Sequence, residues 1–376
     1  MHASVTGPRG QPRTRVIGPR GQPRTRVTGP RDQPRTRVTG PRGPRGQPPT
    51  IERALSPLDT LRRHGLRALG GVGRRLIRDR ELRVGVGAAL AIGFAFVGAT
   101  TFPIVLLALG PVLLGVPHVL ADLRYLVARR GLHRRALGLL ALAGLAPAAL
   151  LGNVWPALAS AGAVALFSHA SIARRLSVAG LFGVLAVLAS RHRFEADLAF
   201  AHLHNLVAVI LWWLWRPRVT RWHVGALALY VAASLAIVVM PTAWWLGHDV
   251  RFVGFDLHDA RASLAPGWSE GLALRMVVLF AFAQSIHYAV WLRLVPDDDR
   301  ERSTPRTFRA SYAALRDDLG PIVLGLAALS ALGVIAWALV DLGEARAGYL
   351  RAAIFHGHLE LVALALVATE GRPRAA

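Results

Sequence analysis

The chain has 376 residues, of which 53% are hydrophobic and 18% are charged, and its formal net charge is +23. A soluble domain typically has about 25% charged residues, and two 38-residue stretches here (84–121 and 136–173) contain no Asp, Glu, Lys or Arg, which together exclude an ordinary soluble globular protein. The absence of cysteine excludes disulfide bonds, thiolate metal ligands and a cysteine nucleophile.

The first 50 residues repeat an eleven-residue unit, TGPRGQPRTRV, with glycine at positions 7, 18, 29 and 40. Each unit combines prolines and arginines with valine as its apolar residue. Such a unit cannot bury enough apolar surface to offset the entropy that folding removes. We therefore predict a disordered N-terminal tail over residues 1–50.

Residues 51–83 remain rich in arginine but place leucines at short intervals, as in Leu55, Leu58 and Leu61. This pattern is typical of an amphipathic helix that lies on a membrane surface. We predict an interfacial segment of one or two helices here.

Glycine, proline and charged residues divide the rest of the chain into about ten apolar segments. The predicted fold class is all-α, a polytopic transmembrane helical bundle over residues 84–370. The expected spans are 84–101, 103–126, 136–152, 157–173, 176–190, 197–215, 223–245, 271–292, 319–341 and 347–368.

Arginine is concentrated in every second loop, which predicts the orientation by the positive-inside rule. We expect a multi-pass protein of the inner (cytoplasmic) membrane with both termini in the cytoplasm. Membrane lipid is the expected partner of the positive charge, and no nucleic acid is expected to bind the membrane domain. The acidic run 297–299, within the long segment 293–318, is interpreted as part of a solvated loop with a short helix.

Seven histidines fall within or at the ends of the predicted spans, where ionisable side chains are costly and usually functional. They all lie on even-numbered spans. For a single histidine, a hydrogen bond between helices is the competing interpretation. In each His-x-His pair, we expect one ring to face the bundle interior, because residues two apart point in nearly opposite directions. The seven are His118, His169, His202, His204, His287, His356 and His358.

Two of these histidines precede a carboxylate by four residues, so that imidazole and carboxylate share a helix face. The pairs are His118 with Asp122 and His356 with Glu360. Imidazole and carboxylate together suit a transition metal such as iron. We predict an Fe(II) site in which Asp122 and Glu360 act as catalytic ligands or as partners that orient the ligands. The predicted metal ligands are His118, His202, His287 and His356. A haem held by two histidines is the alternative cofactor.

The eight residues 115–122 resemble a known signature. Gly115-Val116-Pro117-His118, followed by Asp122, is similar to the Gly-x-Pro-His-x-x-x-Asp motif of the Brp/Blh membrane family of β-carotene 15,15′-dioxygenases. The resemblance implies an all-helical membrane protein whose histidines hold iron that splits a carotenoid into retinal. By residue, only His118 and Asp122 carry over from it.

Three functions are compatible with these residues. The first is an iron-dependent oxygenase acting on an apolar isoprenoid or lipid substrate. The second is a transporter or proton-relay protein in which the same side chains line a path. The third is a non-catalytic membrane structural protein whose histidines form hydrogen bonds between helices.

Overall fold

The computed structural model describes residues 50–217 and 220–371. The predicted disordered tail, residues 1–50, lies outside the described residues except for Thr50. Every regular element that is described is a helix, and β pairing there is confined to one bridge between Phe252 and Phe255. The predicted all-α class is therefore confirmed for this part of the chain.

The predicted interfacial segment contains three short helices, α1 (Thr50–Ala54), α2 (Ser56–Ala68) and α3 (Gly70–Arg78). Large apolar side chains on α2 and α3, such as Leu61 and Val72, are exposed among the arginines. An amphipathic surface of this kind suits a bilayer interface. Their place at the membrane surface stays a prediction.

Eight described helices are long and apolar enough to cross a bilayer. The α5 helix continues as a π-helical turn to Ala128, and α12 continues through a second π-helical turn into α13 (Val295–Asp298). The short α11 (Leu257–Leu264) lies in the loop before α12. The eight are α4 (Arg80–Thr101), α5 (Pro103–Asp122), α8 (Ile172–Arg191), α9 (Arg193–Trp215), α10 (Arg221–Val239), α12 (Glu270–Ala289), α14 (Phe308–Val340) and α15 (Leu342–Glu370).

The predicted spans 136–152 and 157–173 correspond to shorter helices, α6 (Ala136–Leu151) and α7 (Trp155–Leu166), of 16 and 12 residues. At about 1.5 Å per residue, they are roughly 24 and 18 Å long, less than the ~30 Å thickness of the hydrocarbon core. The prediction of about ten full spans is thus reduced to eight among the described residues. Because α6 and α7 are consecutive, their loss as spans leaves an even number.

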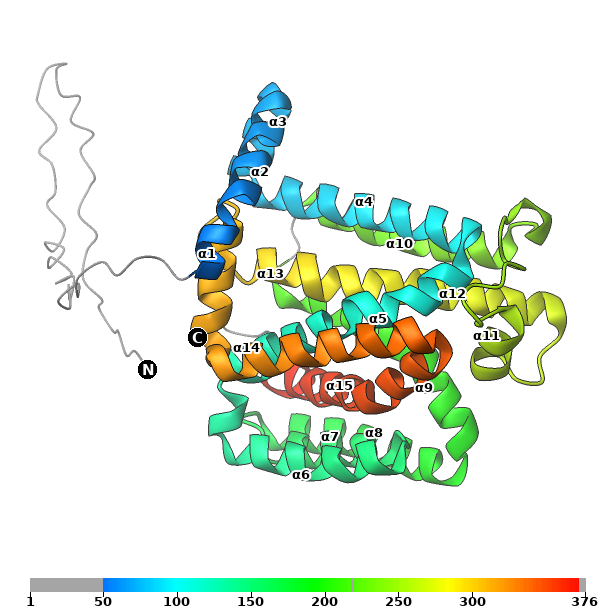
Figure 1. Ribbon diagram of the computed structural model, residues 1–376. Helices are drawn as coiled ribbons and strands as arrows, with labels where there is room; N and C mark the ends of the chain where they lie inside the picture. Colours follow the sequence, from blue (N-terminus) through cyan, green and yellow to red (C-terminus); the bar gives the residue numbers. More distant parts are fainter. Residues whose placement is uncertain (1–49, 218–219, 372–376) are drawn as a thin grey trace, which may run out of the picture. The chain divides into compact units, whose positions relative to one another are not determined.

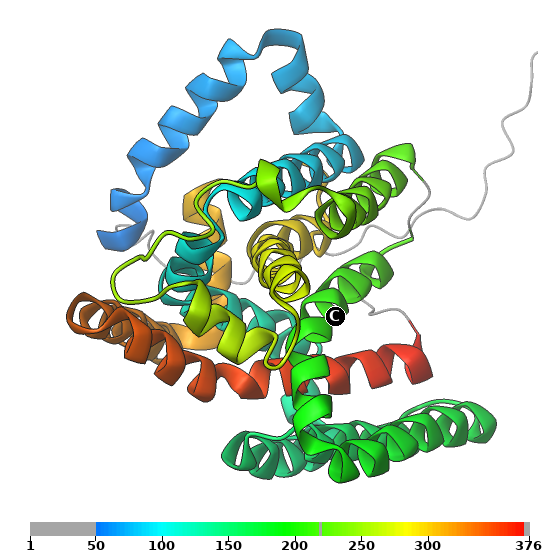
Figure 2. The same ribbon diagram turned by 90° about the vertical axis from the view of Figure 1, so that its right-hand side faces the viewer.

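Burial separates the central helices from the peripheral ones. In α12 and α15, 72% of the apolar stretch is buried, whereas none of that of α14 is. Figure 2 shows α12, in yellow, nearly end-on with other helices around it, and in Figure 1 the helices α6, α7 and α8 lie side by side. The α14 helix bends at Gly320, whose φ is 80°, just before Pro321, close to the predicted start of a span at 319.

The acidic run 297–299 was interpreted as a solvated loop, and this prediction is wrong. Asp297 and Asp298 are each only 3% exposed. Arg83 binds Asp297 through two hydrogen bonds, Nε to Oδ2 at 2.7 Å and Nη2 to Oδ1 at 2.9 Å. The indole of Trp212 donates to Asp298 at 2.9 Å. The acidic run therefore joins α13 to α4 and α9 instead of facing water.

Candidate metal centre

Four side chains from three helices converge in the interior. His118 and Asp122 come from α5, His287 from α12 and His356 from α15. One ligand atom from each lies within 4.8 Å of every other. Each of the four residues is at most 8% exposed. The protein thus contains a buried group of three histidines and one aspartate that could hold a metal ion.

The hydrogen bonds of two rings fix where their lone pairs point. His118 Nδ1 lies 3.3 Å from the Leu114 carbonyl oxygen, and His356 Nδ1 bonds the Ala353 carbonyl oxygen. Because a carbonyl can only accept, the Nδ1 atoms carry the hydrogens and the neutral rings have bare Nε2 atoms. These two Nε2 atoms face each other 3.2 Å apart. Two facing lone pairs repel one another unless a proton or a cation lies between or beside them.

Other atoms of the group have no hydrogen-bond partner among the described residues. Both nitrogens of His287 and both carboxylate oxygens of Asp122 are buried in this state. A buried polar group without a partner costs about 1–3 kcal/mol, and more when it is charged. A metal ion would give these donor atoms the partner that the protein does not supply.

Glu360 lies beside the group without belonging to it. Its Oε1 accepts a 2.6 Å hydrogen bond from the Trp291 indole and lies 3.7 Å from His287 Nε2. The residue is fully buried. This placement suits a carboxylate that orients a histidine, one of the two roles predicted for Glu360.

The histidines on α9 do not lie as predicted. His202, a predicted ligand, points away from the group, and its Nε2 lies 2.8 Å from the Leu264 carbonyl oxygen. The ring of His204 lies instead beside the group, with centroids 5.3 Å from His287 and 5.8 Å from His356. As the i, i+2 spacing predicts, one of the two rings faces inward. That ring is His204 and not the predicted ligand His202.

Two further histidines lie outside the metal group. His358 is fully buried and stacks on Phe200, with centroids 5.5 Å apart. His169 is not in a helix, because α7 ends at Leu166, and its backbone N–H donates to Glu370. The prediction that His169 lies within or at the end of a span is therefore wrong.

Two glycines allow the site-bearing helices to approach closely. A Cβ added at Gly115 would overlap the ring of Tyr349, so glycine lets α5 pack on α15 one turn before His118. A Cβ added at Gly357 would lie 2.9 Å from Phe200 Cζ on α9. Small residues have this use wherever membrane helices pack tightly. Close packing against Tyr349 thus explains the glycine of the Gly-x-Pro-His segment.

Replacing Gly357 with alanine tests this packing. We expect Gly357→Ala to lower the free energy of unfolding by about 1–3 kcal/mol, as overpacking does, and to weaken metal binding, because the Phe200 ring must give way or push the α15 backbone beside His356. Thermal unfolding and metal content of the purified protein measure the two effects. Gly333→Ala on α14, where an added Cβ meets nothing within 4 Å, is the matched control and should change neither. Equal behaviour of the two variants would contradict the packing role.

Both α5 and α12 widen into π-helical turns next to the site. One turn, Leu123–Ala128, starts directly after Asp122, and the other, Val290–Leu294, starts three residues after His287. Such turns occur frequently at functional sites. The second one contains Trp291 and so places the indole that binds Glu360. Sequence periodicity did not reveal either turn.

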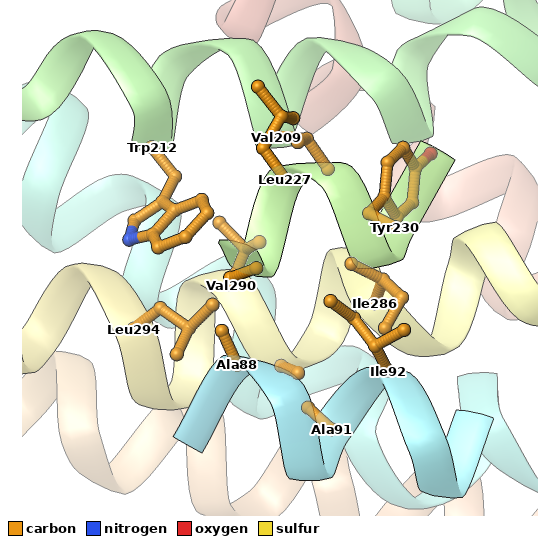
Figure 3. A pocket seen from close by; sticks show the side chains of 12 residues that line it. Ala88, Ala91, Ile92, Val209, Trp212, Leu227, Tyr230, Ile286, Val290 and Leu294 are labelled. Atoms are coloured by element: carbon orange, nitrogen blue, oxygen red, sulfur yellow. The ribbon is translucent and has the colours of Figure 1, made fainter. Parts of the chain in front are cut away.

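A separate apolar cavity lies between α4, α9, α10 and α12. Figure 3 shows its lining side chains, among them Ile92, Val209 and Ile286. Its volume is about 10 Å³, roughly enough for one water. None of the residues of the metal group lines it. It is a small apolar void apart from the metal group.

Comparison of the chain with protein-family models, with curated proteins and with solved structures finds no match. The resemblance of residues 115–122 to the Brp/Blh family therefore stays a prediction. Function has to be argued from the arrangement of the side chains.

Proposed function

We propose that the protein is a metal-dependent membrane enzyme, an iron-dependent oxygenase acting on an apolar isoprenoid or lipid substrate. The observation that carries the proposal is the pair of bare Nε2 atoms, on His118 and His356, that face each other 3.2 Å apart in the membrane interior. The arginine distribution favours the inner membrane, with both termini in the cytoplasm.

The donor set fits a non-haem Fe(II) ion. His118, His287, His356 and Asp122 would hold it, and nitrogen and carboxylate oxygen are the ligands of non-haem iron oxygenases. The four donor atoms all lie within 4.8 Å of one another, so that one ion would contact all of them after small side-chain movements. A bound Fe(II) would supply the activation of dioxygen.

The arrangement favours a single ion over haem, the alternative cofactor. A porphyrin needs an open plane between its two axial histidines. Here His118 and His356 are only 3.2 Å apart, and donor atoms of His287 and Asp122 lie within 4.8 Å of theirs. No space for a macrocycle remains between the two rings.

The surrounding residues orient two of the histidines and shield the group from water, which supports the proposal. The backbone carbonyls of Leu114 and Ala353 hold the His118 and His356 rings so that Nε2 faces the centre. The ring of Tyr288 lies 4.7 Å from that of His118, and its hydroxyl accepts a hydrogen bond from Gln284 at 3.1 Å. The apolar helices around the group exclude water, which prevents side reactions of an activated oxidant.

Oxygen uptake tests the proposal. The full chain, purified in zwitterionic nanodiscs and loaded with Fe(II), should consume dioxygen when a polyene, isoprenoid or unsaturated lipid from a panel is added. Mass spectrometry should show an oxygenated or cleaved product. Protein loaded with Mg²⁺ is the control, because Mg²⁺ has no redox chemistry and should support no uptake.

The outcome separates the three functions. Substrate flux in proteoliposomes without oxygen uptake would overturn the oxygenase and favour the transporter. Neither flux nor uptake, with no transition metal bound, would leave the structural role.

A further inference from the structure

A large cavity opens where α5 and α12 end. Its volume is about 650 Å³, within the ~300–1,000 Å³ typical of small-molecule sites. Residues of α2, of the loop after α13 and of the start of α14 close its other sides. On the predicted orientation, this end of the bundle faces the cytoplasm, at the level of the lipid head groups.

The polar part of the cavity wall is strongly basic. Asp297 is the one carboxylate among the described lining residues, and both of its oxygens already bind Arg83. Arg124 pairs with Asp318 at 2.7 Å, whereas neither Arg62 nor Arg306 forms an ion pair with a described carboxylate. The five arginines that line the cavity are Arg62, Arg124, Arg293, Arg300 and Arg306.

Arg300 shows that this positive charge lacks compensation. Its side chain is 10% exposed, and its Nε is buried without a hydrogen-bond partner among the described residues. Its nearest carboxylate oxygen, on Asp297, lies 3.6 Å away and is shared with Arg83. Burial lowers the pKa of Arg300 to about 10. An anion in the cavity would pair with this buried positive charge and lower the cost of burying it.

The inner part of the wall is apolar. Pro117, Leu120 and Ala121 of α5 face Trp291 and Leu292 of the π-helical turn after α12. Pro117, Leu120 and Ala121 stand in sequence beside His118 and Asp122 of the metal centre. An occupant that covers this wall needs an apolar chain, and the arginines at the other end need an anion.

We propose that this cavity binds a phosphate-bearing amphiphile, with the phosphate on the arginines and the apolar chain against the α5–α12 wall. Guanidinium groups match phosphate oxygens through paired hydrogen bonds. A phosphate monoester carries up to two negative charges and so balances several arginines better than a carboxylate does. The site does not require a metal in the histidine group, so it stands independently of the proposed oxygenase.

Equilibrium binding of radiolabelled hexadecyl phosphate to the full chain in zwitterionic nanodiscs tests the proposal. We expect saturable binding that hexadecanol does not displace. The Arg62→Gln/Arg306→Gln variant should bind at least about tenfold more weakly, since it loses two charge-assisted hydrogen-bonding groups. Arg63→Gln/Arg67→Gln, which removes the same charge from exposed positions on α2, should bind like the wild type. Arg306→Gln alone keeps the backbone carbonyl that accepts from Arg62 and covers the case in which the double variant fails to fold.

Competition identifies the source of the phosphate. Displacement by phosphatidylglycerol added to the nanodisc would support the site with a bilayer lipid as occupant. Binding that this lipid does not displace would support a single-chain occupant. Equal affinity for inorganic phosphate or for hexadecanol would overturn the proposal, as would unchanged affinity in the folded arginine variants. Binding should persist in metal-free protein and in His118→Ala, which separates this result from the fate of the oxygenase.

Discussion

A His356→Ala variant should lose metal binding while keeping its fold. In the wild type, a saturating transition metal should raise the unfolding free energy by about 3 kcal/mol at a free concentration of roughly one hundred times Kd. The variant should show no such increase, because one of the two facing Nε2 atoms is gone. Without metal, the variant should lose no more stability relative to the wild type than the small cavity left by the imidazole costs. The substitution also removes the repulsion between the two lone pairs. Thermal unfolding with and without Fe(II), together with elemental analysis, measures both effects.

His202→Ala is the matched control. It removes an imidazole from the same membrane interior, but from a ring that binds the Leu264 carbonyl and not the metal group. Metal content should therefore stay at the wild-type level. Equal metal binding by wild type, His356→Ala and His202→Ala would show that the histidines converge without holding an ion.

An Arg83→Met variant should be among the most destabilised single substitutions in the chain. It leaves the buried Asp297 carboxylate without its two-hydrogen-bond partner. Removing one member of a buried ion pair typically costs about 3–5 kcal/mol. Chemical unfolding of the purified protein in detergent measures the loss.

Arg293→Met supplies the comparison for Arg83. Arg293 also contacts Asp297, at 3.2 Å, but its side chain is 51% exposed. Exposed ion pairs contribute about 0–1 kcal/mol, so the loss should be small. An Arg83→Met/Asp297→Asn double variant, which also removes the buried carboxylate charge, should regain part of the stability. Equal losses of unfolding free energy for Arg83→Met and Arg293→Met would show that the buried pair stabilises the protein no more than the exposed one.

The helices could be predicted from the sequence because their signal is local. Long runs without charge, bounded by glycine, proline or arginine, placed most helices within a few residues. The end of α7 could not be placed, because the segment after Leu166 stays without Asp, Glu, Lys or Arg up to Ala173 while the backbone already turns at Phe167. Length and hydropathy alone do not distinguish a half-length apolar helix followed by a turn from a full span.

The site was predicted only in part, because the rotation of each helix is not a local property. The spacing in His202-Leu203-His204 places the two rings on opposite faces, but both faces of α9 are apolar there. Which face turns inward depends on how α9 packs against α12 and α15. For the same reason, the burial of Asp297 could not be foreseen, since its partner Arg83 lies 214 residues away.

The bonds from His118 and His356 to carbonyls of their own helices have a consequence for assembly. Each ring acquires its tautomer as soon as its helix forms, before any neighbour arrives. The direction of each free nitrogen is then decided by how far the helix is turned about its own axis. One residue corresponds to about 100° of rotation, so a helix docked one residue out of phase would present no ligand at all. The close contacts of Gly115 with Tyr349 and of Gly357 with Phe200 favour this rotation of α5 and α15. The donor set is complete once all three helices have packed together.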